Sequence, residues 1–262
     1  MIHVVSEAEG VAAAGARLVG AMLRGRAQRT EDGLSLALSG GATPRRLYEL
    51  LAGEAGEKIP WERISLFWGD ERCVPPKDVR SNYSMVARTG LLGRPLAGVH
   101  RMLGEWPPEE AAAHYEDELK QIFPAMRLPR FDLALLGLGV DGHVASVFPG
   151  SPSLSDRAHW ILPTEVYDGT RRLTVTLPVL ASARSLLFLV SGESKAEAVR
   201  QVLSKDKNVG DRPMPARLLL DMAAISKKAG WECPSATWVL DRGAASLLPE
   251  RGSRLDGEAA PR

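Results

Sequence analysis

The chain of 262 residues is poor in cysteine and contains no long apolar run. Its two cysteines, Cys73 and Cys233, stand far apart and belong to no CxxC pair or Cys/His cluster, so the sequence offers no zinc-binding pattern. The count alone does not exclude a disulfide, but two cysteines in this length fit a reducing cytosol better. No run approaches the roughly 18 consecutive apolar residues of a membrane-spanning helix, so we expect no membrane partner.

The chain also lacks net charge, because 33 Lys and Arg face 32 Asp and Glu, which leaves a formal charge of +1. This balance provides no global field for nucleic acid, so we expect no nucleic-acid partner, and any preference for an anion must come from a local cluster. The first ten residues, MIHVVSEAEG, show no basic stretch followed by a long apolar run. We therefore expect no signal peptide and a cytoplasmic location.

Apolar runs and helical spacings alternate along the chain. Strands are predicted within 1–5 and at 34–38, 64–68, 131–137, 171–180, 185–192 and 236–241. Helices are predicted at 7–24, after Pro44, at 109–123 and at 193–203. Near-continuous apolar strands separated by helices are typical of a parallel sheet covered on both faces. We expect an α/β fold of three layers, with a mostly parallel Rossmann-like sheet flanked by helices, in a single domain over 1–250. The polar segment 251–262 is predicted to be a disordered tail.

A glycine-rich loop follows one predicted strand and opens a helix. In the segment LSGGATP (38–44), Gly40 and Gly41 allow a ligand to approach the backbone closely. Thr43 is predicted to be the N-cap, with Pro44 at the first helical position. Free N–H groups at such a helix end favour a phosphate. The loop matches neither GxGxxG nor GxxxxGK[ST], and a tight turn with a helix cap accounts for it equally well.

Charged residues stand at the ends of other predicted strands. The segment WGDER (68–72) brings Asp70 and Arg72 to a strand end, where Arg72 could bind a phosphate, although a surface salt-bridge cluster is the plainer interpretation. Arg172 opens one strand and Lys195 begins the helix after another. Taken singly they are solvated surface charges, but with the glycine-rich loop they would form the local basic cluster that the net charge does not supply.

The segment 131–150 carries the strongest catalytic signal. It begins as an apolar strand, breaks into glycines and delivers Asp141 and His143 together, at the kind of strand end where open α/β sheets place their chemistry. Histidine titrates near pH 6.5 when unperturbed, which suits proton transfer at cellular pH. Asp141 would fix its tautomer if the two side chains touch, whereas a loop histidine bonded to backbone is the structural alternative.

The other histidines lack a catalytic context: His3, His100, His114 and His159. No GxSxG elbow is present, which argues against a serine hydrolase.

Several motifs occur together in one order and cover nearly the whole chain. They are LSGGATP (38–44), WGDERCVP (68–75) with SNY (81–83), LLGLGVDGHVASVFPG (135–150), RRLTVTLPVL (171–180), SGESKAEAV (191–199), MPAR (214–217) and WVLDRGAASLL (238–248). In this order they resemble the 6-phosphogluconolactonases, within the larger group that includes the glucosamine-6-phosphate deaminases/isomerases. One motif alone is suggestive, whereas the ordered set is highly specific.

Two differences within that group favour the lactonases. The deaminases look similar through the DGH segment but continue with a Phe-Asn-Glu-Pro-like stretch, whose Glu joins the His in a proton relay. Here VASVFPG (144–150) supplies no carboxylate, and Arg72 follows the Asp-Glu pair where the deaminases have an aromatic residue. Val144 stands where the lactonases usually have Thr. We expect this departure to be tolerated, because a side chain next to His143 need not reach the substrate.

The resemblance implies hydrolysis of 6-phospho-D-glucono-1,5-lactone to 6-phosphogluconate, in the oxidative pentose phosphate pathway and without a metal or other cofactor. His143 and Asp141 would be the catalytic residues. The residues implied to bind the substrate and its phosphate are Gly40, Gly41, Thr43, Asp70, Arg72, Arg172 and Lys195. The expected partner is the small lactone, and the expected assembly is a monomer or a weak homo-oligomer.

Two other functions remain open on the sequence. One is a deaminase/isomerase-like enzyme. The other is a non-catalytic sugar-phosphate-sensing domain, of the kind found in some transcriptional regulators. Such a sensor needs an attached DNA-binding module, and with a first strand predicted inside residues 1–5 the sequence shows no helix-turn-helix.

Overall fold

The computed structural model describes residues 1–124, 126–204, 213–228, 235–249 and 254–255. Among these residues, eight strands form one sheet in which every neighbouring pair runs parallel. From one edge to the other they are β11 (Arg254–Leu255), β1 (Ile2–Val5), β10 (Ser235–Asp241), β9 (Ser185–Val190), β6 (Leu133–Leu136), β2 (Leu34–Leu38), β3 (Ile64–Trp68) and β5 (Gly98–His100). All residues of β2 and β6 are buried, as expected for strands with a layer packed on each face.

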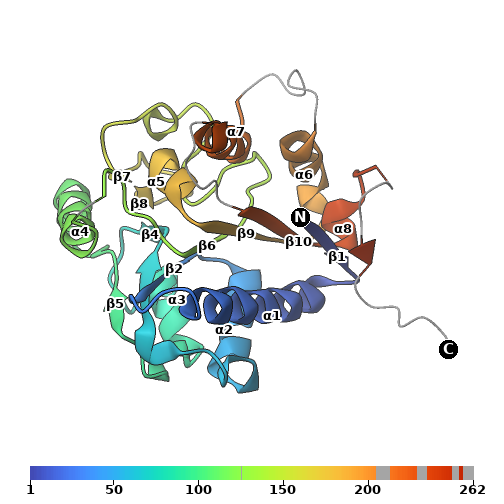
Figure 1. Cartoon of the computed structure of the whole chain (residues 1–262). Helices are drawn as coiled ribbons and strands as arrows, with labels where there is room; N and C mark the ends of the chain where they lie inside the picture. The colour runs from blue at the N-terminus through green and yellow to red at the C-terminus, as the bar shows by residue number, and fades with distance from the viewer. Residues whose placement is uncertain (125, 205–212, 229–234, 250–253, 256–262) are drawn as a thin grey trace.

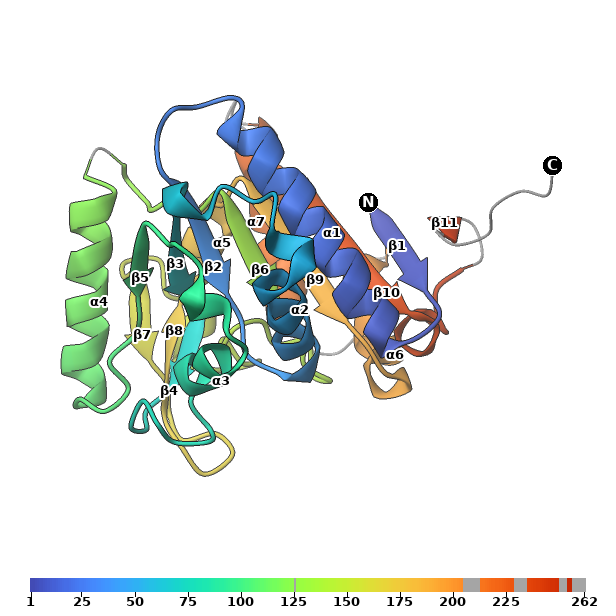
Figure 2. The same cartoon turned by 90° about the horizontal axis from the view of Figure 1, so that it is seen from below.

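Helices cover both faces of this sheet. Helices α1 (Ala8–Ala27) and α2 (Ala42–Ala52) lie on one face, and α5 (Leu177–Ser182) and α7 (Pro215–Lys228) lie on the other (Figure 1). Helix α4 (Pro108–Ile122) stands beyond the β5 edge (Figure 2). The shorter helices are α3 (Asn82–Arg88), α6 (Ala196–Leu203) and α8 (Arg242–Ala245), with 3-10 turns at Glu54–Gly56, Trp61–Arg63, Leu91–Gly93, Pro152–Leu154 and Glu193–Lys195. The predicted three-layer α/β fold is confirmed.

Helix α1 shows why these segments take up their positions. Its buried residues include Val11, Gly15, Val19 and Leu23, which recur every four positions and therefore form one face of the helix. A Cβ at Gly15 would lie 2.7 Å from the Leu47 side chain, so the glycine lets α1 approach α2 closely. No described helix is both long and apolar enough to cross a membrane.

A second, antiparallel sheet was not predicted from the sequence. It consists of β4 (Asp70–Arg72), β8 (Arg172–Val175) and β7 (Ile161–Pro163), with β8 in the middle. The predicted strand at 171–180 is therefore partly wrong, because the strand ends at Val175 and α5 begins at Leu177. Pro178 fits the first turn of a helix, where its missing N–H costs nothing, so the chain turns into a helix there.

The order of the parallel strands points to a candidate ligand site between β2 and β6. From β2 the chain moves outward in one direction through β3 and β5, and from β6 it moves in the other direction through β9 and β10. The order thus reverses between β2 and β6, and open α/β sheets bind ligands outside the carboxyl ends of the strands at such a point. The loops that begin there are residues 39–41 and 137–143, which hold the two glycine-rich motifs.

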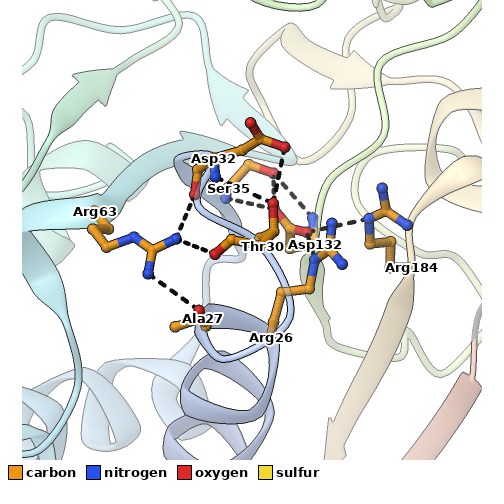
Figure 3. Close-up of polar contacts among 8 residues, drawn as sticks. All are labelled: Arg26, Ala27, Thr30, Asp32, Ser35, Arg63, Asp132 and Arg184. Carbon is orange, nitrogen blue, oxygen red and sulfur yellow. Dashed lines mark hydrogen bonds and ion pairs between the residues drawn. The ribbon is translucent and has the colours of Figure 1, made fainter.

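At the opposite end of the sheet, Asp132 ties three strands together (Figure 3). Its carboxylate accepts hydrogen bonds from the backbone N–H and the hydroxyl of Ser35, both at 3.0 Å. It also pairs with Arg26 at 2.8 Å and with Arg184 at 3.3 Å. The Asp132 side chain is only 10% exposed. These contacts join the amino-terminal ends of β2, β6 and β9 to the end of α1.

This cluster should contribute to stability without affecting the candidate site. We expect Asp132→Ala to lower the free energy of unfolding by about 1–3 kcal/mol, because it leaves the backbone N–H of the buried Ser35 without its acceptor. Activity at saturating substrate should be unchanged, since the cluster is at the other end of the strands. Urea denaturation measures the first quantity. The control is Asp32→Ala, because among the described residues its exposed carboxylate accepts only from the nearby Thr30 hydroxyl. An equal loss in both variants would contradict this role.

Two predictions concern residues at or beyond the limits of the described chain. Of the predicted tail 251–262, residues 254–255 pair with β1 as β11, and the other residues lie outside the described chain. Cys233 also lies outside it, whereas Cys73 is a free cysteine. The single domain over 1–250 and the disorder of the tail stay predictions.

Candidate active site

Asp141 and His143 lie in direct contact on the turn that follows β6. The Asp141 carboxylate accepts hydrogen bonds from His143 Nδ1 at 2.6 Å and from the His143 backbone N–H at 3.1 Å. An ionised carboxylate can only accept, so Nδ1 carries the proton and Nε2 is left as the basic nitrogen. The turn depends on glycine, because Gly142 has a φ of 80° and a Cβ at Gly139 would lie 2.0 Å from His143 Nδ1.

The surroundings of this pair keep the carboxylate ionised. Burial acts to raise the pKa of Asp141, but the hydrogen bonds from His143 outweigh burial and hold that pKa below its usual value. Lys195 belongs to the 3-10 turn before α6, where burial lowers the pKa of its amine and the charge of Asp141 opposes that shift. Asp141 therefore interacts with both His143 and Lys195, which places these three predicted site residues close together.

Arg72 and Arg172 stand directly opposite each other on β4 and β8. Opposed residues of an antiparallel pair point to the same face, and like charges in such positions destabilise the sheet unless an anion joins them. The Nε atoms of both arginines are buried and have no hydrogen-bond partner among the described residues. Burial lowers the pKa of Arg172. The negative charge of Asp70 acts to raise that pKa, and the positive charge of Arg72 lowers it further. A phosphate would satisfy both guanidinium groups.

Asp70 orders Arg72 through an intermediate asparagine. Arg72 Nη1 donates to Asn82 Oδ1 at 2.6 Å, and Asn82 Nδ2 donates to Asp70 Oδ1 at 3.2 Å and to its backbone oxygen at 2.9 Å. The other Asp70 oxygen accepts from the Ser146 hydroxyl at 2.6 Å. Ser146 also lies 3.5 Å from Arg172 Nη1, so one buried network connects both arginines.

Glu71 has a structural role beside this network. Its buried carboxylate accepts from the backbone N–H groups of Arg72, Asn82 and Tyr83 and from the Ser81 hydroxyl, at 2.7 to 2.9 Å. Burial raises the pKa of Glu71, and these hydrogen bonds oppose that shift. Ser81 in turn caps α3 by accepting from the Ser84 N–H. The acidic and basic residues at 70–72 are therefore a buried scaffold and not a surface salt-bridge cluster.

The glycine-rich loop departs from the sequence-based interpretation at the helix cap. The prediction that Thr43 caps α2 is wrong, because the helix begins at Ala42 and its N-cap is Gly41, whose φ of 111° allows the chain to turn there. Thr43 Oγ1 instead lies 2.8 Å from Ser191 Oγ and links the loops after β2 and β9. A Cβ at Gly40 would lie 2.1 Å from Asn82 Oδ1, so this glycine makes room for the residue that holds Arg72.

Two aromatic residues near His143 were not singled out from the sequence. The Phe148 ring lies 4.8 Å from the imidazole between centroids, and the Tyr167 ring stacks on Phe148 at 3.8 Å. Phe148 falls inside a quoted motif, whereas Tyr167 precedes Asp168-Gly169, a dipeptide that favours tight hairpins. That dipeptide was the one sequence signal that pointed to this part of the site.

The turn after β6 also has the spacing of a dinucleotide-binding loop. Residues 137–142, GLGVDG, match GxGxxG, but no helix begins after them, and such a loop binds a pyrophosphate at a helix N-terminus. Within the described ranges, no three or more His, Cys, Asp and Glu side chains are placed to hold a metal ion together. The arrangement instead offers a histidine base beside a cluster of cations.

This combination of fold and site defines an enzyme class that acts on sugar phosphates. Residues 6–228 match the model of one family, and the chain belongs to it: the glucosamine-6-phosphate isomerases/6-phosphogluconolactonases. Among its relatives, the 6-phosphogluconolactonase of Synechocystis is 40% identical over 222 residues, which cover 82% of this chain and 84% of that protein. The human 6-phosphogluconolactonase is 34% identical over 257 residues, covering 95% and 93%. The crystal structure of 6-phosphogluconolactonase from Leishmania guyanensis matches with a TM-score of 0.79 at 26% identity, over 95% of this chain and 98% of that one.

Proposed function

We propose that this protein hydrolyses 6-phospho-D-glucono-1,5-lactone to 6-phosphogluconate, the lactonase step of the oxidative pentose phosphate pathway. The observation that carries the proposal is an Asp141-supported His143 that contacts the Phe148 ring, whose face also contacts the Arg172 guanidinium. The curated relatives that carry the lactonase name support the substrate. A cytoplasmic location, a monomeric or weakly oligomeric state, and activity without a cofactor belong to the same proposal.

In this mechanism His143 moves one proton twice. Its Nε2 takes a proton from a water molecule as the water oxygen attacks the lactone carbonyl carbon. As the tetrahedral intermediate collapses, the bond from that carbon to the ring oxygen breaks, and Nε2–H returns the proton to the ring oxygen. Asp141 holds the Nδ1 proton throughout and stabilises the imidazolium. General acid–base help of this kind accelerates a reaction by about 100- to 10,000-fold.

The phosphate would fix the lactone relative to this base. Arg72, Arg172 and Lys195 supply the positive charge, and the N–H groups of the 39–43 loop add donors at the start of α2. Binding the distal phosphate holds the carbonyl carbon against His143, which is the proximity contribution to the rate. Backbone N–H groups of Gly40–Gly41 or Gly142 are the candidate donors to the oxyanion.

The residues around His143 argue against the deaminase alternative. Ring opening of an amino sugar requires a second carboxylate in the proton relay, and the segment 144–150 contains no acidic residue. The aromatic rings that lie against His143 belong to Phe148 and Tyr167, and both present apolar faces. A sensing domain needs no base held by a carboxylate, so the contact between Asp141 and His143 favours an enzyme.

Two assays on the wild-type protein separate these functions. One follows 6-phosphogluconate formed from freshly generated lactone, corrected for spontaneous hydrolysis, and the other follows ammonia released from glucosamine 6-phosphate. We expect rapid lactone hydrolysis and no ammonia. Ammonia release would establish the deaminase, and binding of both sugar phosphates without turnover would establish the sensor.

The Asp141 carboxylate makes a specific contribution that steady-state kinetics can detect. Its hydrogen bond keeps the proton of His143 on Nδ1 and leaves Nε2 as the base. We expect Asp141→Asn to lower kcat, because an amide that donates its own N–H to Nδ1 favours the other tautomer of the imidazole. An unchanged kcat would remove Asp141 from the catalytic pair. Asp156→Asn, which alters an exposed pair with His159, is the control.

A further inference from the structure

Tyr167 lies beside the candidate site on a hairpin that the proposed function does not account for. Its backbone N–H donates to Thr170 O at 3.0 Å, and Thr170 N–H donates to Tyr167 O at 3.3 Å. The two residues between them, Asp168 and Gly169, have φ values of 51° and 73°. Two successive left-handed residues are characteristic of a type I′ turn, whose twist matches that of the flanking strands. The connection from β7 to β8 therefore holds Tyr167 in a defined place.

The Tyr167 ring forms the outer layer of an aromatic stack over the base. It lies 3.8 Å from the Phe148 ring between centroids, with the two planes inclined by 20°. The Phe148 ring is 4.8 Å from the His143 imidazole, and the Tyr167 ring is 6.2 Å from it, edge to face. Phe148 is 7% exposed, whereas Tyr167 is 41% exposed. Removing the tyrosine ring would therefore expose Phe148 but would leave the core intact.

The same two rings also hold the Arg172 guanidinium. Its carbon lies 5.5 Å from the Phe148 centroid and 5.3 Å from the Tyr167 centroid, both within cation–π range. With the described residues, Arg172 forms no ion pair, and its side chain makes one long hydrogen bond, to Ser146. A carboxylate partner would neutralise the cation, whereas aromatic faces orient it and leave its N–H groups available for an anion.

We propose that Tyr167 is a positioning residue for the reaction. Together with Phe148 it holds the Arg172 guanidinium and the His143 imidazole at the relative positions that allow both to act on one substrate molecule. This inference rests on the proposed function, which assigns the phosphate to Arg172 and the proton to His143. None of the contacts involves the tyrosine hydroxyl, so the ring alone should be sufficient.

Three variants test this role by steady-state kinetics with the phosphorylated lactone. Tyr167→Ala should lower kcat/KM by about 5- to 30-fold, the equivalent of a partly desolvated cation–π contact. Most of the change should be a higher KM, because Tyr167 touches Arg172 directly and reaches the imidazole mainly through Phe148. Tyr167→Phe should retain the wild-type values. Val166→Ala is the matched control, since Val166 lies on the same hairpin and is 67% exposed.

A binding measurement separates failure of this inference from failure of the proposed function. Calorimetric titration with inorganic phosphate requires no turnover. We expect Tyr167→Ala to weaken phosphate binding by about 5- to 30-fold. Tyr167→Phe and Val166→Ala should bind phosphate like the wild type. If the wild type lacks lactonase activity but this pattern holds, the positioning of Arg172 stands and the proposed reaction is wrong. The inference would be overturned if Tyr167→Ala lost no phosphate affinity. It would also be overturned if Tyr167→Phe or Val166→Ala lost as much affinity as Tyr167→Ala.

Discussion

Replacing His143 by alanine should lower kcat for lactone hydrolysis by about 100- to 10,000-fold, which is the range of general acid–base catalysis. The variant loses both the group that takes the proton from water and the group that returns it to the ring oxygen. KM should change little, because the phosphate contacts are made by other residues. Initial rates must be corrected for spontaneous hydrolysis, since the remaining rate of the variant will approach that background.

The structure provides a matched control for this variant. His159 also pairs with an aspartate through Nδ1, at 3.0 Å from Asp156, but it is exposed and lacks the surrounding cations of the site. His159→Ala should retain the wild-type kcat. Both variants should unfold at nearly the same denaturant concentration as the wild type, because neither histidine is in the core. A rate near that of the wild type in His143→Ala would refute the proposed base.

Replacing Arg172 by alanine should raise KM for the phosphorylated lactone by about 10- to 150-fold, with a smaller effect on kcat. One or more charge-assisted hydrogen bonds to the phosphate are lost, and such bonds contribute about 1.5–3 kcal/mol. The predicted value assumes that Arg172 binds the phosphate in the ground state and in the transition state alike. Arg172→Lys should be intermediate, because lysine keeps the charge but not the planar pair of donors.

The neighbouring residue is the appropriate comparison for Arg172. Arg171 precedes it in sequence and carries the same charge, but its guanidinium pairs with the exposed Glu109 of helix α4. Arg171→Ala therefore makes the same change in net charge without removing a donor from the site. If both variants had the same KM, the effect of Arg172 would be a general field effect and the assignment of Arg172 to the phosphate would be wrong.

The parallel sheet was predictable because its strands are buried on both faces. Segments such as 34–38 and 64–68 are apolar except for one serine each, and they match β2 and β3 residue for residue. Of the antiparallel sheet only β8 was predicted, within 171–180, because β4 and β7 have three residues each, too few for a pattern of alternation. Local sequence rules also predicted Thr43 as the N-cap of α2. The helix begins earlier, because the positive φ of Gly41 lets the chain turn two residues before Thr43.

The candidate site was predictable as a set of residues but not as an arrangement. The sequence singled out His143, Asp141, Arg72 and Arg172, and the structure places them in two close pairs. That Arg72 faces Arg172 depends on the pairing of β4 with β8, which are about 100 residues apart in the chain, and no local pattern encodes such a register. The contacts of Tyr167 with Phe148 and of Asn82 with Arg72 also join separate elements, so no local pattern predicts them. The functional roles of all these residues stay predictions.

In the proposed reaction His143, supported by Asp141, hydrolyses a lactone that is held by its phosphate. The most direct test is the ratio of kcat/KM for 6-phospho-D-glucono-1,5-lactone to kcat/KM for the unphosphorylated glucono-1,5-lactone, measured on the wild-type protein under one set of conditions. With at least two charge-assisted contacts to the phosphate, we predict a ratio of at least about 100. Equal values for the two lactones, or no hydrolysis of the phosphorylated lactone above the spontaneous rate, would contradict the account.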